Sequence, residues 1–219
     1  MTRPRILLLG GSHARPSHTG ALLRAAEDCL LERGASTCRW DIGSSPLPPV
    51  LREPVAPHEA SRARALRAEA EACDGFVVAT PLYHGSYSGC VKDALDHLSA
   101  KEVQGKVVAL LSHAGGFPTT QALDHLAAVA RSLRTLAVPA QIVTVNGDYR
   151  LCGDRYVLAS EEVGARLGAL ADELLSLAVR LRPLAAVEPR GRPPLLSTLE
   201  RRVDEQRSHH DRSRVVQRS

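Results

Sequence analysis

The sequence has 219 residues and a formal net charge of +4, with 44% hydrophobic and 3% aromatic residues. This length suits one domain with or without a tail, and the composition is that of an ordinary globular protein. No apolar run approaches the roughly 20 residues that cross a bilayer, and seven aromatic residues offer few rings to stack on nucleic-acid bases. We therefore expect neither a membrane nor a nucleic-acid partner.

Compartment and redox state follow from the N-terminus and the cysteines. The apolar run that begins after Arg5 is shorter than the roughly 7–15 residues of a secretory signal, so we expect a cytoplasmic protein. The five cysteines are widely spaced and form no C-x-x-C motif, so we expect neither a disulfide framework nor a metal site.

The positive charge is concentrated at the C-terminus. Residues 183–219 hold eight arginines against five acidic residues, which leaves the preceding part of the chain close to neutral. We predict one domain over residues 1–182 and a Pro/Arg-rich, largely disordered tail over residues 183–219.

The first half of the domain alternates short apolar runs with amphipathic stretches. A strand is predicted at residues 5–9, a helix at 19–33, a weaker strand at 37–42 and a second helix at about 58–73. The third strand, at residues 76–79, is a continuous apolar run of the kind found in strands buried on both faces.

The second half continues the same alternation. Ser88 is predicted to cap a helix with an inner face at Val91, Ala94, Leu95 and Leu98. A strand at 106–111 and a helix that begins near Pro118 and extends its apolar face to Leu136 follow. The last predicted elements are a strand at 141–145 and a helix that opens at Ser160.

Alternating strands and helices predict an α/β fold with a five-stranded parallel sheet and helices on both faces, which is a three-layer sandwich. Ligands of such sheets bind beyond the carboxyl ends of the strands. The segments after the first, third and fourth strands are therefore the candidate site.

The segment after the first strand is rich in hydroxyl groups and leads directly into a helix. It contains Ser12, Ser17 and Thr19, with Arg15 among them. The first N–H groups of a helix are free and lie at the positive end of its dipole, so this segment can hold a phosphate group. An ordinary helix cap made by Ser17 or Thr19 is an equally good interpretation of the segment taken alone.

The other two segments are suited to a flat ring. Tyr83 and Tyr87 follow the third strand and can form a platform for a ligand, although Tyr83 packed under the sheet edge is the alternative. After the fourth strand, Gly115 and Gly116 allow a close backbone approach and expose N–H groups. His113 is a weak candidate for a proton donor.

A phosphate pocket beside a flat-ring pocket fits flavin mononucleotide (FMN) best. The flavodoxin-like strand order places this cofactor at the switch between the first and third strands. We therefore predict a flavodoxin-like sandwich that binds FMN.

Three stretches, residues 7–23, 72–99 and 103–116, resemble the NADPH-dependent FMN reductase family. The middle stretch is the most specific and carries a Thr-Pro-x-Tyr pattern that begins at Thr80. The subgroup that the sequence resembles most comprises the FMN reductases of two-component sulfonate monooxygenase systems.

The resemblance implies roles for individual residues. Ser12, Ser17 and Thr19 would hold the FMN phosphate, with Arg15 one place after the position where the family commonly has arginine and this chain has Ala14. The isoalloxazine ring would be contacted by two groups of residues: Pro81, Leu82, Tyr83 and Ser86, and, through backbone groups, His113, Ala114, Gly115 and Gly116. No side chain need be catalytic, because the flavin carries the chemistry.

The implied activity is hydride transfer from NADPH or NADH to FMN, which supplies reduced flavin to a flavin-dependent monooxygenase. The resemblance also implies a homodimer or homotetramer. One alternative is a reductase that keeps its FMN and reduces quinones, azo compounds or a biosynthetic intermediate. Another is a flavodoxin-like electron carrier, although such carriers are usually strongly acidic.

Overall fold

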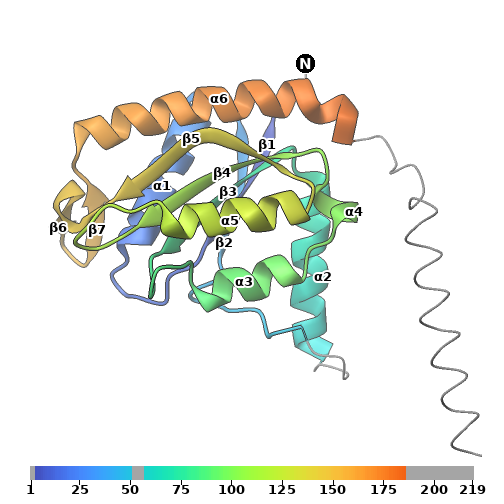
Figure 1. Ribbon diagram of the computed structural model, residues 1–219, viewed down its shortest axis with the longest axis horizontal. Helices are drawn as coiled ribbons and strands as arrows, with labels where there is room; N and C mark the ends of the chain where they lie inside the picture. Colours follow the sequence, from blue (N-terminus) through green and yellow to red (C-terminus); the bar gives the residue numbers. More distant parts are fainter. Residues whose placement is uncertain (1–2, 51–56, 186–219) are drawn as a thin grey trace, which may run out of the picture. The chain divides into compact units, whose positions relative to one another are not determined.

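The computed structural model describes residues 3–50 and 57–185 (Figure 1). The tail predicted over residues 183–219 lies outside these residues from 186 onward. No helix in the described part of the chain is long and apolar enough to cross a membrane.

A five-stranded parallel sheet forms the centre of the fold, with the strand order β2-β1-β3-β4-β5. This is the flavodoxin-like order predicted from the sequence. All its strands end at the same edge, on the left-hand side of Figure 1. The strands are β1 (Arg5–Gly10), β2 (Ser36–Asp41), β3 (Gly75–Pro81), β4 (Val107–His113) and β5 (Leu136–Thr144).

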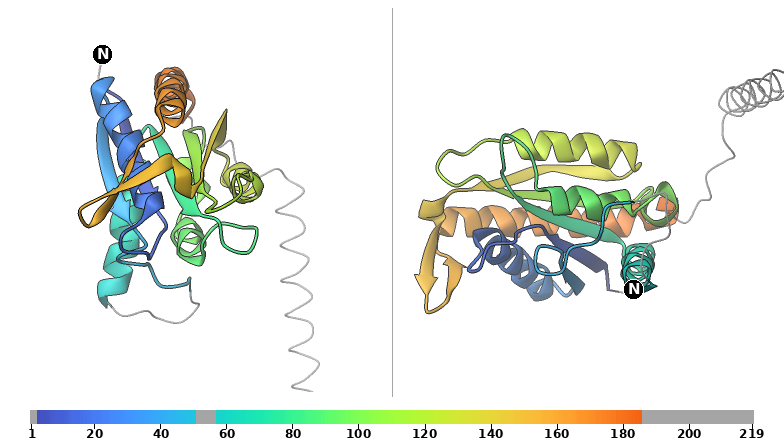
Figure 2. Two further views of the ribbon diagram at one scale, coloured as in Figure 1. Left: turned by 90° about the vertical axis from the view of Figure 1, so that its left-hand side faces the viewer. Right: turned by 90° about the horizontal axis from the view of Figure 1, so that it is seen from below.

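Helices cover both faces of the sheet. The two that pack on one face are α1 and α6, whereas α2, α3 and α5 pack on the other (Figure 2). A short helix, α4, follows α3. The helices are α1 (His18–Glu32), α2 (Pro57–Ala72), α3 (Gly89–Asp96), α4 (Ala100–Val103), α5 (Gln121–Ser132) and α6 (Glu161–Ala185).

The side chains of β1 point alternately into two hydrophobic cores, one on each face of the sheet. Ile6 and Leu8 point into the core beneath α1 and α6, and Leu7 and Leu9 point into the other. All four are at most 1% exposed, because successive side chains of a strand face opposite sides of the sheet. The continuous apolar run therefore reflects a strand that is covered on both faces.

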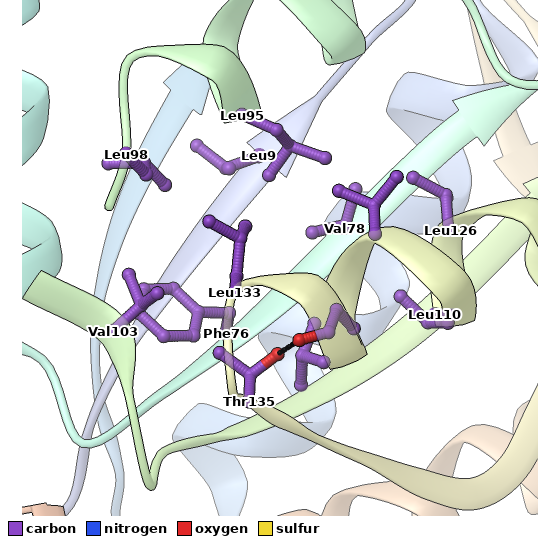
Figure 3. Close-up of a pocket in the computed structure, with 13 residues that line it drawn as sticks. Leu9, Phe76, Val78, Leu95, Leu98, Val103, Leu110, Leu126, Leu133 and Thr135 are labelled. Atoms are coloured by element: carbon purple, nitrogen blue, oxygen red, sulfur yellow. Dashed lines mark hydrogen bonds between the residues drawn. The ribbon is translucent and has the colours of Figure 1, made fainter. Parts of the chain in front are cut away.

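The core beneath α3 and α5 contains a gap of about 30 Å³ (Figure 3). Its lining is almost entirely aliphatic and includes Leu9, Val78 and Leu126 (Figure 3). The space exceeds only modestly the roughly 10–15 Å³ needed for one water molecule. It is a packing gap between the sheet and its helices.

The fifth strand differs from the prediction. β5 begins at Leu136, five residues before the predicted strand. Leu136 therefore belongs to a strand and not, as predicted, to the apolar face of the preceding helix. Its side chain is 48% exposed. Pro139 lies inside β5, which is possible because β5 is an edge strand with a register shift against β4.

A two-stranded hairpin, which the sequence analysis missed, connects β5 to α6. Its strands are β6 (Tyr149–Cys152) and β7 (Arg155–Leu158), after a short 3-10 turn at Asn146–Asp148. The two residues between the strands, Gly153 and Asp154, are a recognised hairpin-turn pair, so a signal was present. The hairpin packs against α1.

Candidate functional site

The three predicted segments lie together at the carboxyl edge of the sheet. Leu82 N donates to His113 O (2.8 Å), which joins the segments after β3 and β4. The N–H of Gly11 donates to Ala79 O (2.9 Å), which joins the segment after β1 to the end of β3.

Ser88 links the segment after β1 to the segment after β3 by hydrogen bonds. Its hydroxyl donates to Gly11 O (2.7 Å), and its N–H donates to Thr80 Oγ1 (3.0 Å). Ser88 occupies the N-cap position of α3, as predicted, but its side chain makes no capping hydrogen bond. The residue therefore joins loops rather than capping the helix.

The segment between β1 and α1, residues 11–17, is here called the phosphate loop. Ser17 caps α1, and its Oγ accepts from Gly20 N (3.0 Å). Ser12 Oγ accepts from Ala14 N (3.3 Å). The N–H groups of His18 and Thr19 have no hydrogen-bond acceptor within residues 3–50 and 57–185. The cap is present, and free donors remain for an anion.

Thr19 and Arg15 differ in their surroundings. Thr19 is 2% exposed, and its hydroxyl makes no hydrogen bond with any residue that the structure describes. Arg15 is exposed and forms a salt bridge with Asp41 at the end of β2 (2.9 Å). The charge of Arg15 is therefore already partly compensated.

The segment after β3 contains a tight reverse turn. Tyr83 and Ser86 exchange two backbone hydrogen bonds (2.8 and 3.0 Å) across His84 and Gly85, which both have positive φ. This geometry is typical of a two-residue β-turn. Tyr83 is 47% exposed, so its ring is not packed beneath the sheet edge. Ser86 Oγ forms a hydrogen bond with His125 Nδ1 on α5 (3.0 Å), a partner that the sequence analysis did not identify.

The segment after β4 offers free backbone donors. Ala114 N donates to Thr144 O (2.8 Å), whereas the N–H groups of Gly115 and Gly116 make no hydrogen bond in the described part of the chain. Gly115 has φ +70°, which favours glycine. Phe117, which follows, is 85% exposed.

A cluster of rings ties the end of β4 to α1 and to the hairpin. His18 stacks between His113 (centroids 4.4 Å apart) and Tyr156 (3.6 Å). Tyr149 meets both histidines edge-on. The sequence analysis assigned no role to His18, whose position next to the N-cap became informative only with the fold.

His113 is a neutral, hydrogen-bonded member of this cluster. Its Nδ1 lies 3.3 Å from Thr144 Oγ1 and its Nε2 lies 3.2 Å from Asn146 Oδ1. Burial, and then the neighbouring His18, lower the pKa of His113 to about 4. Both ring nitrogens are thus occupied and the imidazole is uncharged near neutral pH, which argues against a general-acid role.

A cavity of about 240 Å³ lies beside the phosphate loop. Among the predicted phosphate contacts, Ser12, Arg15 and Ser17 line it, and Thr19 does not. No residue of the other two segments contributes to it. The remaining lining residues come from α1, β2 and the hairpin (Gly20, Leu23, Arg24, Arg39, Asp41, Asp154 and Arg155), together with Gly10 at the end of β1 and Pro16 of the phosphate loop.

The sequence is similar to those of known proteins. The model of the NADPH-dependent FMN reductase family matches residues 4–149. The chain is 33% identical over 174 residues to an FMN-dependent NADPH-azoreductase of Staphylococcus saprophyticus, which covers 78% of this chain and 93% of the relative.

Solved structures share the fold. The apo form of the NADH:FMN oxidoreductase EMOB has a TM-score of 0.65 and 22% identity, covering 88% of this chain and 98% of the other. The NAD(P)H:(acceptor) oxidoreductase FerB from Paracoccus denitrificans has a TM-score of 0.65 and 20% identity, covering 82% and 98%.

Proposed function

Because the chain belongs to the NADPH-dependent FMN reductase family, we propose that it retains FMN and reduces a small acceptor of the azo or quinone type with NADPH or NADH. The family makes the chain an NAD(P)H:FMN oxidoreductase. The azoreductase relative, similar over nearly its whole length, is the observation that favours an FMN-retaining enzyme.

The residues at the sheet edge fit FMN. The hydroxyls of Ser12 and Ser17 and the free N–H groups of His18 and Thr19 supply several donors for a phosphate within a short stretch of chain. The donors of Gly115 and Gly116 are available for the polar edge of the ring. Bound at these residues, FMN would supply the chemistry of hydride transfer between the nicotinamide and the acceptor.

The protein's own contribution is binding, orientation and electrostatics. The Ser88 hydroxyl and the Leu82 N–H hold the three segments together by hydrogen bonds to the backbone oxygens of Gly11 and His113. Tyr83 is 47% exposed, so its ring is available to a flavin or a substrate. The free N–H groups of Gly115 and Gly116 would stabilise negative charge on a ring bound beside them.

The second candidate is release of reduced flavin to a flavin-dependent monooxygenase. The sequence resemblance to the reductases of sulfonate monooxygenase systems favours it. The two functions differ in whether FMN stays on the protein during turnover.

The test is the absorbance spectrum of the purified protein, followed by NADPH and NADH oxidation with and without added FMN. We expect a yellow protein that decolourises an azo dye or reduces a quinone without added FMN. A colourless protein that oxidises NADPH only with free FMN would overturn FMN retention and support the monooxygenase function. A yellow protein that oxidises neither nucleotide would indicate an electron carrier.

A further inference from the structure

A stack of aromatic rings connects two of the segments that form the proposed FMN site. His18 is the first residue of α1, next to Ser17, and its N–H is one of the free donors proposed for the phosphate. His113 is the last residue of β4 and precedes the glycine pair proposed for the polar edge of the ring. The two imidazoles are parallel to within 12°, and their centroids lie 4.4 Å apart. A side-chain contact therefore joins the phosphate end of the site to its ring end.

The His18 ring is held on its other face as well. Tyr156 of the hairpin stacks on it with centroids 3.6 Å apart and an angle of 19° between the planes, and Tyr149 meets it edge-on at 5.0 Å. Aromatic rings attract one another in stacked and edge-to-face arrangements. The ring nitrogens of His18 make no hydrogen bond in the part of the chain that the structure describes. Stacking therefore decides where this ring lies.

His113 is tied by hydrogen bonds to the segment that carries the glycine pair. Its Nε2 lies 3.2 Å from Asn146 Oδ1, and Asn146 N donates to Gly115 O (2.8 Å). Its Nδ1 lies 3.3 Å from Thr144 Oγ1, which also accepts from Tyr149 OH (2.8 Å). A displacement of the His113 ring would therefore reach Gly115 through Asn146.

The loop hydrogen bonds and the ring stack hold opposite ends of the phosphate loop. Gly11, at its start, is joined by hydrogen bonds to β3 and to the segment that follows it. Residues 13–16 are exposed, and the free N–H groups lie beyond them, at His18 and Thr19. The position of these donors relative to the ring segments therefore depends on the contacts of α1, among which the His18 ring reaches His113 directly.

The separation of the two ends matters for a ligand that binds at both. FMN carries a flat ring at one end and a phosphate at the other. A ligand held at two points binds more tightly than either part alone only where both points fit at once. Anchor points that are already in place also reduce the entropy lost on binding. A rigid contact between the two ends of the site would therefore increase the affinity for FMN without touching it.

We propose that His18 is a positioning residue for FMN. Its ring, stacked on His113 and Tyr156, sets the distance between the phosphate donors at the start of α1 and the ring donors of the glycine pair. This role rests on the proposed placement of FMN at the sheet edge.

Three variants test this role. His18→Ala removes the ring, whereas His18→Phe keeps an aromatic ring in the stack. Burial lowers the pKa of both His18 and His113, so the imidazole that phenylalanine replaces is uncharged near neutral pH. His97→Ala is the control, because it removes a half-buried histidine at the end of α3 whose Nε2 lies 2.8 Å from Pro48 O, outside the three segments.

The measurements separate the whole ligand from its parts. Dissociation constants for FMN and for riboflavin, which has the same ring without the phosphate, are obtained by quenching of flavin fluorescence. Inorganic phosphate is titrated as a competitor of FMN. Thermal melts of each apoprotein show that the variants fold and record any loss of stability.

We expect the wild type to bind FMN at least about a hundredfold more tightly than riboflavin. In His18→Ala the FMN dissociation constant should rise at least about tenfold, whereas those for riboflavin and phosphate should change less than about threefold, because each part still binds but the two no longer fit together. His18→Phe should bind FMN within about threefold of the wild type. His97→Ala should melt at a lower temperature with unchanged FMN affinity.

Unchanged FMN affinity in His18→Ala would overturn the positioning role and leave the proposed function intact, since the stack would then only stabilise the fold. Equal losses of FMN and phosphate affinity would also overturn it, because His18 would then act on the phosphate alone. The same holds if His18→Phe loses as much FMN affinity as His18→Ala. A wild type that binds neither flavin would contradict the proposed function, and the positioning role with it.

Discussion

Ser17 caps helix α1 and also lines the cavity beside the phosphate loop. Replacing it with aspartate keeps an acceptor for the cap, because aspartate is a good N-cap residue. The added negative charge would repel a phosphate, so we expect Ser17→Asp to weaken FMN binding at least about tenfold with little loss of folding stability.

The measurement is a fluorescence titration with FMN, beside a thermal melt of the apoprotein. Ser17→Asn is the matched control, since it preserves the cap without the charge and should bind FMN far better than the aspartate variant. Normal FMN affinity in Ser17→Asp would show that the phosphate lies elsewhere.

Ser88 is 2% exposed, and its hydroxyl holds the phosphate loop through Gly11 O. Ser88→Ala leaves that buried carbonyl without its donor, so we expect a loss of about 1–3 kcal/mol in the free energy of unfolding. Urea denaturation measures it, with the exposed Ser132→Ala as the control. A change as small as in the control would mean that the Gly11 carbonyl finds another donor.

At the scale of elements, the stack of His18, His113 and Tyr156 joins α1, β4 and the hairpin. The pKa of His113 is about 4 in the folded protein and that of His18 is also lowered by burial, whereas an unfolded histidine titrates near about 6.5. Between these values the unfolded state binds more protons than the folded state.

Stability should therefore be complete above about pH 6.5 and decrease as the pH falls toward 4, by about 1–3 kcal/mol after allowance for partial solvent exposure. Urea midpoints at several pH values between 4.5 and 7.5 measure this dependence. His113→Gln, which cannot titrate, should have a shallower pH dependence than the wild type. Equal slopes for the two proteins would show that His113 does not contribute.

Strands and helices differed in how readily they could be predicted. The sequence located three strands closely: β1, β3 and β4. Each is a continuous apolar run, which is typical of a parallel strand buried on both faces. The predicted start of β5 was wrong because Pro139 argues against a strand unless that strand lies at the edge of a sheet. Which strand lies at the edge depends on the order of all five strands, and the sequence alone does not show that order. α4 carries the capping box of Ser99 and Glu102, a local signal that was overlooked.

At the scale of the whole molecule, every residue of the candidate site lies within residues 3–185. We therefore expect a chain truncated after Ala185 to retain FMN binding and the melting temperature of the full chain. A thermal melt and an FMN titration of both proteins measure this. Loss of FMN binding on truncation would contradict the prediction that residues 1–182 form the functional domain.

The sequence predicted three segments of the candidate site, and the structure brings them together. Ser12 and Ser17, the ring segments and the glycine pair are contiguous motifs placed after apolar strands, and parallel strands bring such segments to one edge. The general-acid role considered for His113 depended on its surroundings, which the ring stack determines.

The sequence by itself determined the parallel sheet and its two-sided burial, and it predicted the phosphate loop, because these depend on local periodicity and on short motifs. Only the tertiary structure decided which charges meet at the cavity. Arg155 lies far along the chain from Arg24 and Arg39, and no pattern of spacing relates the three. They come together because β2 pairs with β1 and because the hairpin packs on α1, and these long-range contacts carry no local signature.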